Sequence, residues 1–232
     1  MRTWNGAVPA AQTQYEAKRQ ALLREAATCF TKKGYHGTSL TEIAETLGVS
    51  KAALYTYVKS KDELLFFCHQ AAMDAALDSV AQARKMEGNG LEKLCGALRS
   101  YLTLVLSNNP SYVLILEEHA LTKDHVAAII ARRDLFENQL RALVSLGMAD
   151  GSVVRCDPKL AVFAALGMVN WVMKWYAPGG SWAGEQIAVE LVRMLERMLS
   201  TQPVAALPAD PFGDSLRVSP PAAAPIWADI SR

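Results

Sequence analysis

The amino-acid sequence predicts an all-α protein in which a small N-terminal helical domain precedes a larger helical body, with about nine helices in all. Three observations support this fold class. Apolar residues recur at three- and four-residue steps along most of the 232 residues, no segment alternates polar and apolar residues as a strand would, and prolines are rare before position 203. With 51% apolar residues, the chain can bury a hydrophobic core without disulfides or a metal.

The first part of the chain predicts an arm followed by a bracing helix. Residues 1–14 contain a proline and little periodicity, so we expect a flexible arm. A first helix is expected from about Tyr15 to Lys33, because apolar residues such as Leu23 and Phe30 share one face and Gly34 follows as a helix stop.

Three helix-start signals follow in quick succession. Serines stand at positions 39, 50 and 60, and a glutamate follows the first and the third of them three residues later, which is the spacing of a capping box. We therefore expect a short helix from Leu40 to Leu47, a turn at Gly48-Val49, a second short helix from Lys51 to Val58, and a long helix over about 62–86.

The rest of the chain continues the helical pattern and ends in a tail. Helices are expected at about 91–108, 110–120, 123–146, 158–176 and 182–200, with Asp157 and Ser181 as N-caps of the last two. From Pro203 the sequence is rich in Pro and Ala without a period, which predicts a mostly disordered tail. The expected division is an arm at 1–14, a first domain at 15–65, a body at 66–200 and a tail at 201–232.

The small net charge of +1 conceals an asymmetry. Residues 1–61 hold nine Lys and Arg residues against four Asp and Glu residues, whereas the remainder holds fifteen against nineteen. A basic head on a mildly acidic body is typical of a phosphate-binding module attached to another domain.

The cysteines and the apolar segments indicate a cytoplasmic location. The four cysteines lack CxxC spacing, and the first 30 residues lack the pattern of a secretory signal. The longest apolar run, from Leu160 to Tyr176, contains Asn170 and Lys174 and is shorter than the roughly 20 residues that a membrane span needs. We expect no transmembrane helix.

The two short helices can be stable only when they pack on the helices before and after them, because eight residues bury little surface alone. Two short helices joined by a tight glycine-containing turn form a helix-turn-helix. We expect its small core to consist of Ile43, Ala44, Leu47, Val49 and Leu54.

The second short helix then exposes residues suited to DNA. These are Lys51, Ala52, Ala53, Tyr55, Thr56 and Tyr57. Lys51 and Thr56 can reach base edges or phosphates, the tyrosines can donate to phosphate oxygens, and Lys61 adds a cation at a helix N-terminus. The alternative is an ordinary helical bundle in which both tyrosines are packing residues.

The segment GYHGTSLTEIAETLGVSKAALYTYVKSKDELL resembles the DNA-binding signature of the TetR family of transcriptional regulators. The resemblance covers about residues 15–65. It implies that Thr41, Lys51, Ala52 and Thr56 face the bases, and that Ser39, Tyr55, Tyr57 and Lys61 hold the DNA backbone. One departure is Tyr57-Val58, where the family usually has an aromatic residue followed by Phe.

The same resemblance implies a homodimer on a palindromic double-stranded operator, because two heads need two-fold symmetry to match it. The last two expected helices, rich in Ala, Val, Leu and Met, are the best candidates for the dimer interface. The resemblance also implies that a small-molecule effector binds in residues 66–200 and alters the spacing of the two heads.

The segment ALGMVNWVMKWYAPGGSWAGEQIA resembles, over a shorter stretch, the C-terminal domain of a TetR branch that responds to acyl-coenzyme A thioesters in lipid, sterol or aromatic-acid catabolism. This resemblance implies an acyl-binding set of apolar residues: Tyr101, Leu104, Tyr112, Leu116, Phe136, Phe163 and Leu166. The residues available for the phosphates and adenine of coenzyme A are Arg132, Arg133, Trp171 and Lys174, accompanied by Asn170.

Other interpretations remain open. Trp171 and Trp175 are also suited to packing in a dimer, Arg132 and Arg133 to a solvated face, and the inducer to an unrelated hydrophobic molecule. A further class is a helical acyl-CoA carrier or an enzyme.

A metal site is not expected. Glu117, Glu118, His119 and His125 lie close in sequence, but the two histidines are six residues apart and do not share one helix face. The sequence also contains no GxGxxG or P-loop and no supported nucleophile set, so neither a cofactor nor catalysis is predicted. The leading hypothesis is a repressor that a small molecule, such as an acyl-CoA thioester, releases from its operator.

Overall fold

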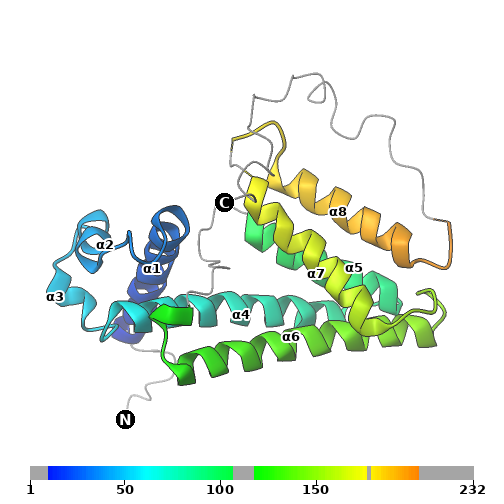
Figure 1. Ribbon diagram of the computed structural model, residues 1–232, viewed down its shortest axis with the longest axis horizontal. Helices are drawn as coiled ribbons and strands as arrows, with labels where there is room; N and C mark the ends of the chain where they lie inside the picture. The colour runs from blue at the N-terminus through cyan, green and yellow to red at the C-terminus, as the bar shows by residue number, and fades with distance from the viewer. Residues whose placement is uncertain (1–9, 107–117, 177–178, 204–232) are drawn as a thin grey trace, which may run out of the picture.

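The computed structural model describes residues 10–106, 118–176 and 179–203, and over these ranges it is helical, with a small head beside a larger body (Figure 1). Eight α-helices and one short 3₁₀ helix lie in the described part of the chain. The predicted all-α class is confirmed, and the number of helices is close to the nine expected. The predicted tail from 204 onward and the arm at 1–9 lie outside the described residues.

The head consists of α1 (Ala10–Lys33), α2 (Leu40–Thr46), α3 (Lys51–Leu54) and the first turns of α4 (Lys61–Lys85). Helix α1 begins five residues before the expected start, so part of the expected arm is helical. Alanine and glutamine, which fill most of these positions, are good helix formers even where no apolar face develops.

Helix α3 is shorter than predicted. It ends at Leu54 rather than Val58, and the N–H groups of Thr56 and Tyr57 donate to carbonyls three residues back, at 3.3 and 2.9 Å. This tighter winding carries the chain around so that Val58, only 3% exposed, enters the head core.

The head core joins α1, α2 and α4. Ile43, Ala44 and Leu54 belong to it as predicted, and Leu47 packs against it half-buried. The prediction for Val49 is wrong, since its side chain is 44% exposed. Gly48 adopts a left-handed φ of 65°, and the turn that it begins leaves Val49 on the outside.

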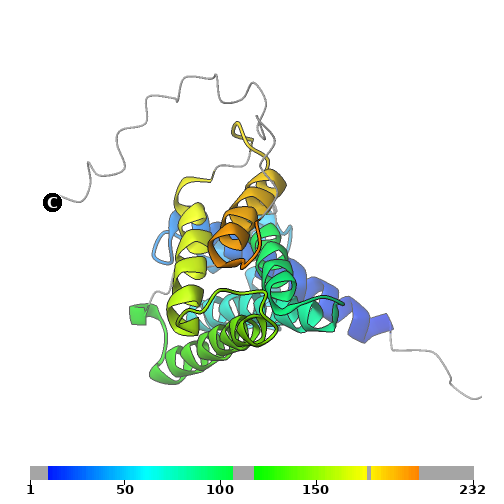
Figure 2. The same ribbon diagram turned by 90° about the vertical axis from the view of Figure 1, so that its right-hand side faces the viewer.

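The body contains the rest of α4 with α5 (Gly90–Leu106), α6 (Lys123–Ala149), α7 (Pro158–Trp175) and α8 (Gly184–Leu199). Helices α4 and α6 lie side by side, and α5, α7 and α8 lie on one side of that pair (Figures 1 and 2). The expected helix at 110–120 lies mostly outside the described residues, and its last three residues form a 3₁₀ helix, Glu118–Ala120. Helix α6 ends three residues later than predicted.

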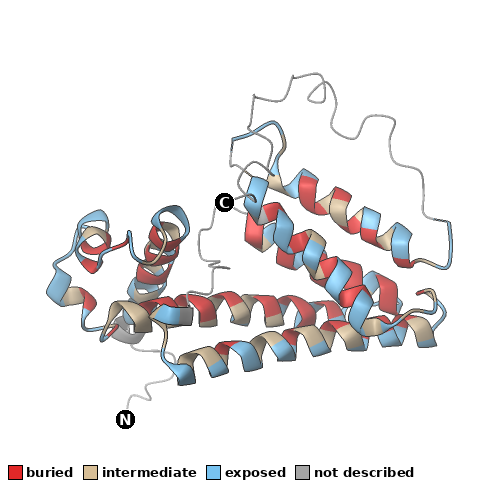
Figure 3. Ribbon diagram, in the orientation of Figure 1, coloured by how far each residue is buried: buried red, intermediate tan, exposed pale blue. Residues whose placement is uncertain are grey.

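Helix α4 contributes to two separate cores, and its buried face follows much of its length (Figure 3). Leu64 and Cys68 belong to the core of the head, whereas Ala72, Ala76 and Val80 belong to the core of the body. The small alanines let neighbouring helices approach α4 closely. Head and body are therefore joined by one uninterrupted helix.

The end of the body distant from α3 is fixed by a backbone-to-backbone approach. The Cβ atom of an alanine at Gly90 would lie 2.2 Å from the backbone nitrogen of Gly147, so no side chain fits there. The N–H of Gly90 donates to Asp150 at 2.7 Å, and the N–H of Leu91 donates to Ser152 Oγ at 3.2 Å. These bonds tie the start of α5 to the loop after α6.

Candidate nucleic-acid interface and effector region

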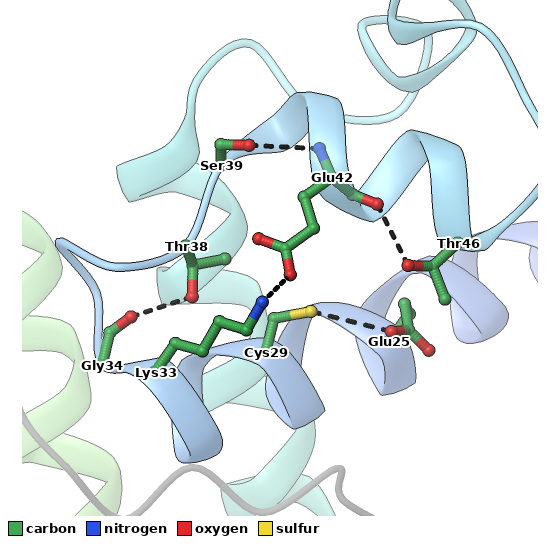
Figure 4. A network of polar contacts seen from close by, with 8 residues as sticks. All are labelled: Glu25, Cys29, Lys33, Gly34, Thr38, Ser39, Glu42 and Thr46. Atoms are coloured by element: carbon green, nitrogen blue, oxygen red, sulfur yellow. Dashed lines mark hydrogen bonds and ion pairs between the residues drawn. The ribbon is translucent and has the colours of Figure 1, made fainter.

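The first short helix of the head, α2, is anchored at its start by a polar network (Figure 4). Ser39 Oγ accepts from the N–H of Glu42 at 3.1 Å and so caps α2. Lys33 at the end of α1 forms an ion pair with the Glu42 carboxylate, and Thr38 Oγ1 donates to the carbonyl of Gly34 at 2.8 Å. The capping hydroxyl of Ser39 is exposed and keeps its own proton for a further acceptor.

The turn between the two short helices is set by local backbone bonds. Gly48 takes the left-handed conformation, and the N–H of Val49 donates to the Ala44 carbonyl at 2.9 Å. Ser50 then caps α3, because its Oγ accepts from the N–H of Ala53 at 3.2 Å. The two helices and the turn form the helix-turn-helix that the serine spacing predicted.

The predicted DNA-contacting residues differ in exposure. The exposed members are Ser39, Thr41, Lys51, Ala52, Tyr55 and Thr56, and the half-buried members are Ala53, Tyr57 and Lys61. Tyr55 is 50% exposed, whereas the ring of Tyr57 stacks on Tyr15 of α1 with centroids 4.8 Å apart. Tyr57 therefore presents less of its surface than the sequence pattern suggests.

Lys61 occupies a position that sequence reasoning did not foresee. Its Nζ donates to the carbonyl oxygens of Tyr35 and Thr38, both at 2.9 Å, and lies 4.1 Å from the centroid of the Tyr35 ring. These partners precede it by 26 and 23 residues, so no local spacing signalled the contact.

Four of the predicted acyl-binding residues lie in or against one apolar cluster of the body. Tyr101 of α5 and Phe136 of α6 are buried, and their ring centroids are 5.1 Å apart. Leu104 of α5 and Leu166 of α7 pack half-buried against the same cluster. Tyr112 and Leu116 lie outside the described residues.

The other predicted ligand residues on α7 lie on its solvent-facing side. Phe163 and Trp171 are 48% and 53% exposed, and Asn170 and Lys174 are exposed as well. The expected grouping of Phe163 with Tyr101 is therefore not found within one chain, because Phe163 lies on the opposite side of α7 from the body core.

The predicted cations of α6 have different surroundings. Arg132 forms an ion pair with Asp74 of α4, and Arg133 is half-buried. His125 stacks on Phe66 of α4 with centroids 4.0 Å apart and near-parallel rings. In the described part of the chain, no group of three His, Cys, Asp or Glu side chains is placed to hold a metal ion.

Two hollows lie in the body, and of the predicted ligand residues only Leu104 lines either of them. A groove of about 580 Å³ between α5 and α8 is lined by Cys95, Arg99, Leu104 and Glu196, among others. A second hollow of about 490 Å³, at the end of α5, is lined by Leu106, Tyr176 and Trp182. Such hollows depend on how helices meet, which periodicity along one helix does not reveal.

None of the helices described here is long and apolar enough to cross a membrane.

Two family profiles match separate parts of the chain. The profile described as "Bacterial regulatory proteins, tetR family" matches residues 22–66, which hold the helix-turn-helix. The profile described as "Tetracyclin repressor-like, C-terminal domain" matches residues 87–199, which hold most of the body.

Individual relatives are regulators. The "HTH-type transcriptional activator FasR" of Mycolicibacterium smegmatis is 32% identical over 113 residues, 49% of this chain and 52% of that protein. The "HTH-type transcriptional repressor KstR2" of the same species is 24% identical over 196 residues, 81% of this chain and 93% of that protein.

Among solved structures, AibR in complex with isovaleryl coenzyme A and operator DNA is 33% identical with a TM-score of 0.67, and the match covers 76% of this chain and 97% of AibR. PfmR of Thermus thermophilus, a TetR family transcriptional regulator, is 31% identical with a TM-score of 0.69, covering 78% of this chain and 99% of PfmR.

Proposed function

Because this chain belongs to the TetR family of bacterial transcriptional regulators, we propose that residues 15–65 bind operator DNA and that an effector in residues 66–200 releases it. The proposal makes α3 the helix that enters the major groove. Its exposed residues, Lys51, Ala52, Tyr55 and Thr56, supply the contacts.

The observation that carries the DNA-binding role is the exposed surface of the capped helix-turn-helix. The small side chain of Ala52 allows the backbone of α3 to approach the bases, while Lys51 and Thr56 reach donors and acceptors on their edges. Tyr55 and the hydroxyl of Ser39 donate to phosphate oxygens and set the orientation of the head.

We propose an acyl-coenzyme A thioester as the effector. AibR, which is similar over nearly its full length, was solved with isovaleryl coenzyme A and operator DNA. In this chain the apolar cluster around Tyr101, Phe136, Leu104 and Leu166 suits an acyl group. The effector regulates only if it binds the DNA-free geometry of the protein more tightly than the DNA-bound one.

We propose that the dimer forms through α7 and α8. Both helices carry large apolar side chains that are exposed in the single chain: Leu160 (67%), Phe163 (48%), Trp171 (53%), Met194 (48%) and Met198 (56%). Exposed apolar surface of this extent is typical of an interaction site. In a two-fold symmetric dimer, this surface of one protomer packs against the same surface of its partner. This assigns Phe163 to the dimer and not to the acyl group, and Trp171 to the dimer and not to the phosphates and adenine of coenzyme A.

We propose that the protein acts as a repressor. KstR2 is described as a repressor and FasR as an activator, and the same DNA-binding head serves either role, because the outcome depends on where the operator lies relative to the promoter. We assign the protein no catalytic role and no cofactor, and we place it in the cytoplasm, where its DNA lies.

The test is a gel shift at fixed salt with DNA from the promoter region upstream of the protein's own gene, with and without a panel of acyl-CoA thioesters that includes isovaleryl-CoA. We expect specific binding that one thioester class reverses. Lys51→Ala should weaken binding at least tenfold, which corresponds to the loss of about 1.4 kcal/mol.

The matched control is Lys85→Ala, which removes the same charge from the exposed far end of α4. It should leave binding unchanged. Specific binding that no thioester alters would reject the acyl-CoA effector alone, whereas thioester turnover without operator binding would favour a carrier or an enzyme.

A further inference from the structure

We infer that Lys61 is a positioning residue of the DNA-binding head, which clamps the turn between α1 and α2 to the start of α4 and makes no phosphate contact. The inference rests on the proposed function only where its test measures DNA binding. Resemblance to the family implies the opposite role for this lysine, so the two assignments can be separated by experiment.

The geometry of the ammonium group argues for a clamp. An ammonium has three N–H donors, and two of them are directed at the carbonyl oxygens of Tyr35 and Thr38 at 2.9 Å. The centroid of the Tyr35 ring lies 4.1 Å from the nitrogen, within cation–π distance. Two of the three donors are therefore already used within the head, which leaves at most one for a phosphate oxygen.

The clamped turn is short and carries its own hydrogen bonds, including that from Thr38 Oγ1 to the carbonyl of Gly34. Residues 34–38 contain two glycines, and only Thr38 is buried, at 1% exposure. Gly34 takes a left-handed φ of 69°, and the Cβ of a residue at Gly37 would lie 2.3 Å from the carbonyl oxygen of Lys33. The turn is therefore tight, and polar bonds to its carbonyls hold it in place.

The clamp is connected to the DNA-reading surface through one short path. The carbonyl of Thr38 accepts from Lys61, and the next residue, Ser39, caps α2. Helix α2 in turn fixes the turn that leads into α3. A shift of Thr38 moves the start of α2, and with it the orientation of α3 toward the bases.

Lys61→Met tests the assignment, because methionine keeps the apolar stem and removes all donors. We expect specific operator affinity to fall about tenfold, non-specific affinity to change less than twofold, and the urea midpoint of unfolding to fall. The slope of log K against log salt should stay unchanged, since no phosphate contact is lost.

Lys51→Met is the matched comparison, because Lys51 is exposed at the start of α3. Its loss should reduce the magnitude of the salt slope by about 0.9 without lowering the urea midpoint. The same result for Lys61→Met, a slope reduced by about 0.9 with an unchanged midpoint, would overturn the clamp.

Lys61→Arg provides a variant that keeps the charge. A phosphate contact would tolerate or favour arginine, whereas a planar guanidinium cannot place one point donor between two carbonyls, so the clamp predicts weaker specific binding. Retained affinity in Lys61→Arg would count against the inference. Absence of operator binding by the unmodified protein would contradict the proposed function instead, and the urea midpoints of both Lys61 variants would still test the clamp.

Discussion

Asp150 is a single residue that holds several segments together at the end of the body distant from α3. Its carboxylate accepts from the N–H groups of Gly90 and Ser152, at 2.7 and 3.0 Å. Hydrogen bonds from the Ser152 side chain and from these two N–H groups lower the pKa of the Asp150 carboxyl below its usual value. The charged form is therefore favoured in the folded protein.

This lowered pKa gives a pH-dependent prediction. A group with a depressed folded-state pKa stabilises the protein above its unfolded pKa, about 3.9 for Asp, and the contribution is lost as the pH falls through the folded value. Asp150→Asn should therefore lower the urea midpoint at pH 7, and the difference from the unmodified protein should shrink below about pH 4.

The comparison for this prediction is Asp78→Asn, at an exposed position on α4. It should leave the midpoint at pH 7 unchanged. An Asp150→Asn midpoint equal to that of the unmodified protein at pH 7 would show that the three hydrogen bonds contribute nothing.

At this scale, local contacts could be read from the sequence and distant ones could not. The caps Ser39, Ser50 and Ser60 bond to N–H groups three residues away, so signals within a few residues identified them: a glutamate three residues on for Ser39 and Ser60, and the preceding Gly48 for Ser50. Lys61 has partners more than twenty residues away. Its charge was visible in the sequence, but the carbonyls that accept its hydrogen bonds were not.

Among the helices, the pair α5 and α6 depends on two glycines that meet. The Cβ of an alanine at Gly90 would lie 2.2 and 2.4 Å from the backbone N and Cα of Gly147. Because backbone atoms cannot rotate away as a side chain can, one of the helices would have to shift.

Gly90→Ala should therefore lower the free energy of unfolding by about 1–3 kcal/mol, the usual cost of overpacking a core. Urea unfolding at a fixed protein concentration measures it. Gly96→Ala, on the same helix α5, is the control, since the nearest atom to its Cβ would be Sδ of the flexible Met86 side chain, at 3.2 Å. There, alanine in a helix interior should cost nothing or add up to about 1 kcal/mol. Equal midpoints for the two variants would contradict the close approach.

The existence of most helices could be predicted because each signal lies within the element. Start signals and apolar periodicity placed α2, α4, α5 and α7 close to their observed bounds. The end of α3 was wrong by four residues, because its last turn is decided by the burial of Val58 in a core shared with α1 and α4. Propensity within α3 carries no information on that packing.

For the whole molecule, the proposed interface on α7 and α8 predicts that a dimer is the unit that binds DNA. Trp171→Glu should leave the single chain folded, because the side chain is already 53% exposed, but it places a charge in the proposed interface. We expect a monomer by sedimentation at micromolar concentration and at least a tenfold loss of operator affinity, since only a dimer engages both half-sites.

Ala81→Glu adds the same charge at an exposed position on α4 and should remain dimeric. A Trp171→Glu variant that stays dimeric would exclude α7 as the central contact.

The sequence predicted two domains and a helical body, but not which faces of the body helices meet. Phe163 and Leu166 both lie on α7, yet one is exposed and the other packs against the core. Assigning either to a ligand requires the position of α7 relative to its neighbours. Relationships between helices, and between two chains, are set by packing among distant segments, so sequence patterns leave them open.

The shared helix α4 is also long enough to amplify a small tilt. Ala72 is the first buried residue of α4 that belongs to the body core, and it lies eleven residues after Lys61 in the head. At 1.5 Å per residue this is a distance of about 16 Å along the helix. A tilt of about 10° around Ala72 would displace the head by about 3 Å, close to the spacing of one base pair along a DNA strand. A small change in packing around Ala72 and Ala76 is thus large enough to move a recognition helix out of register with its operator.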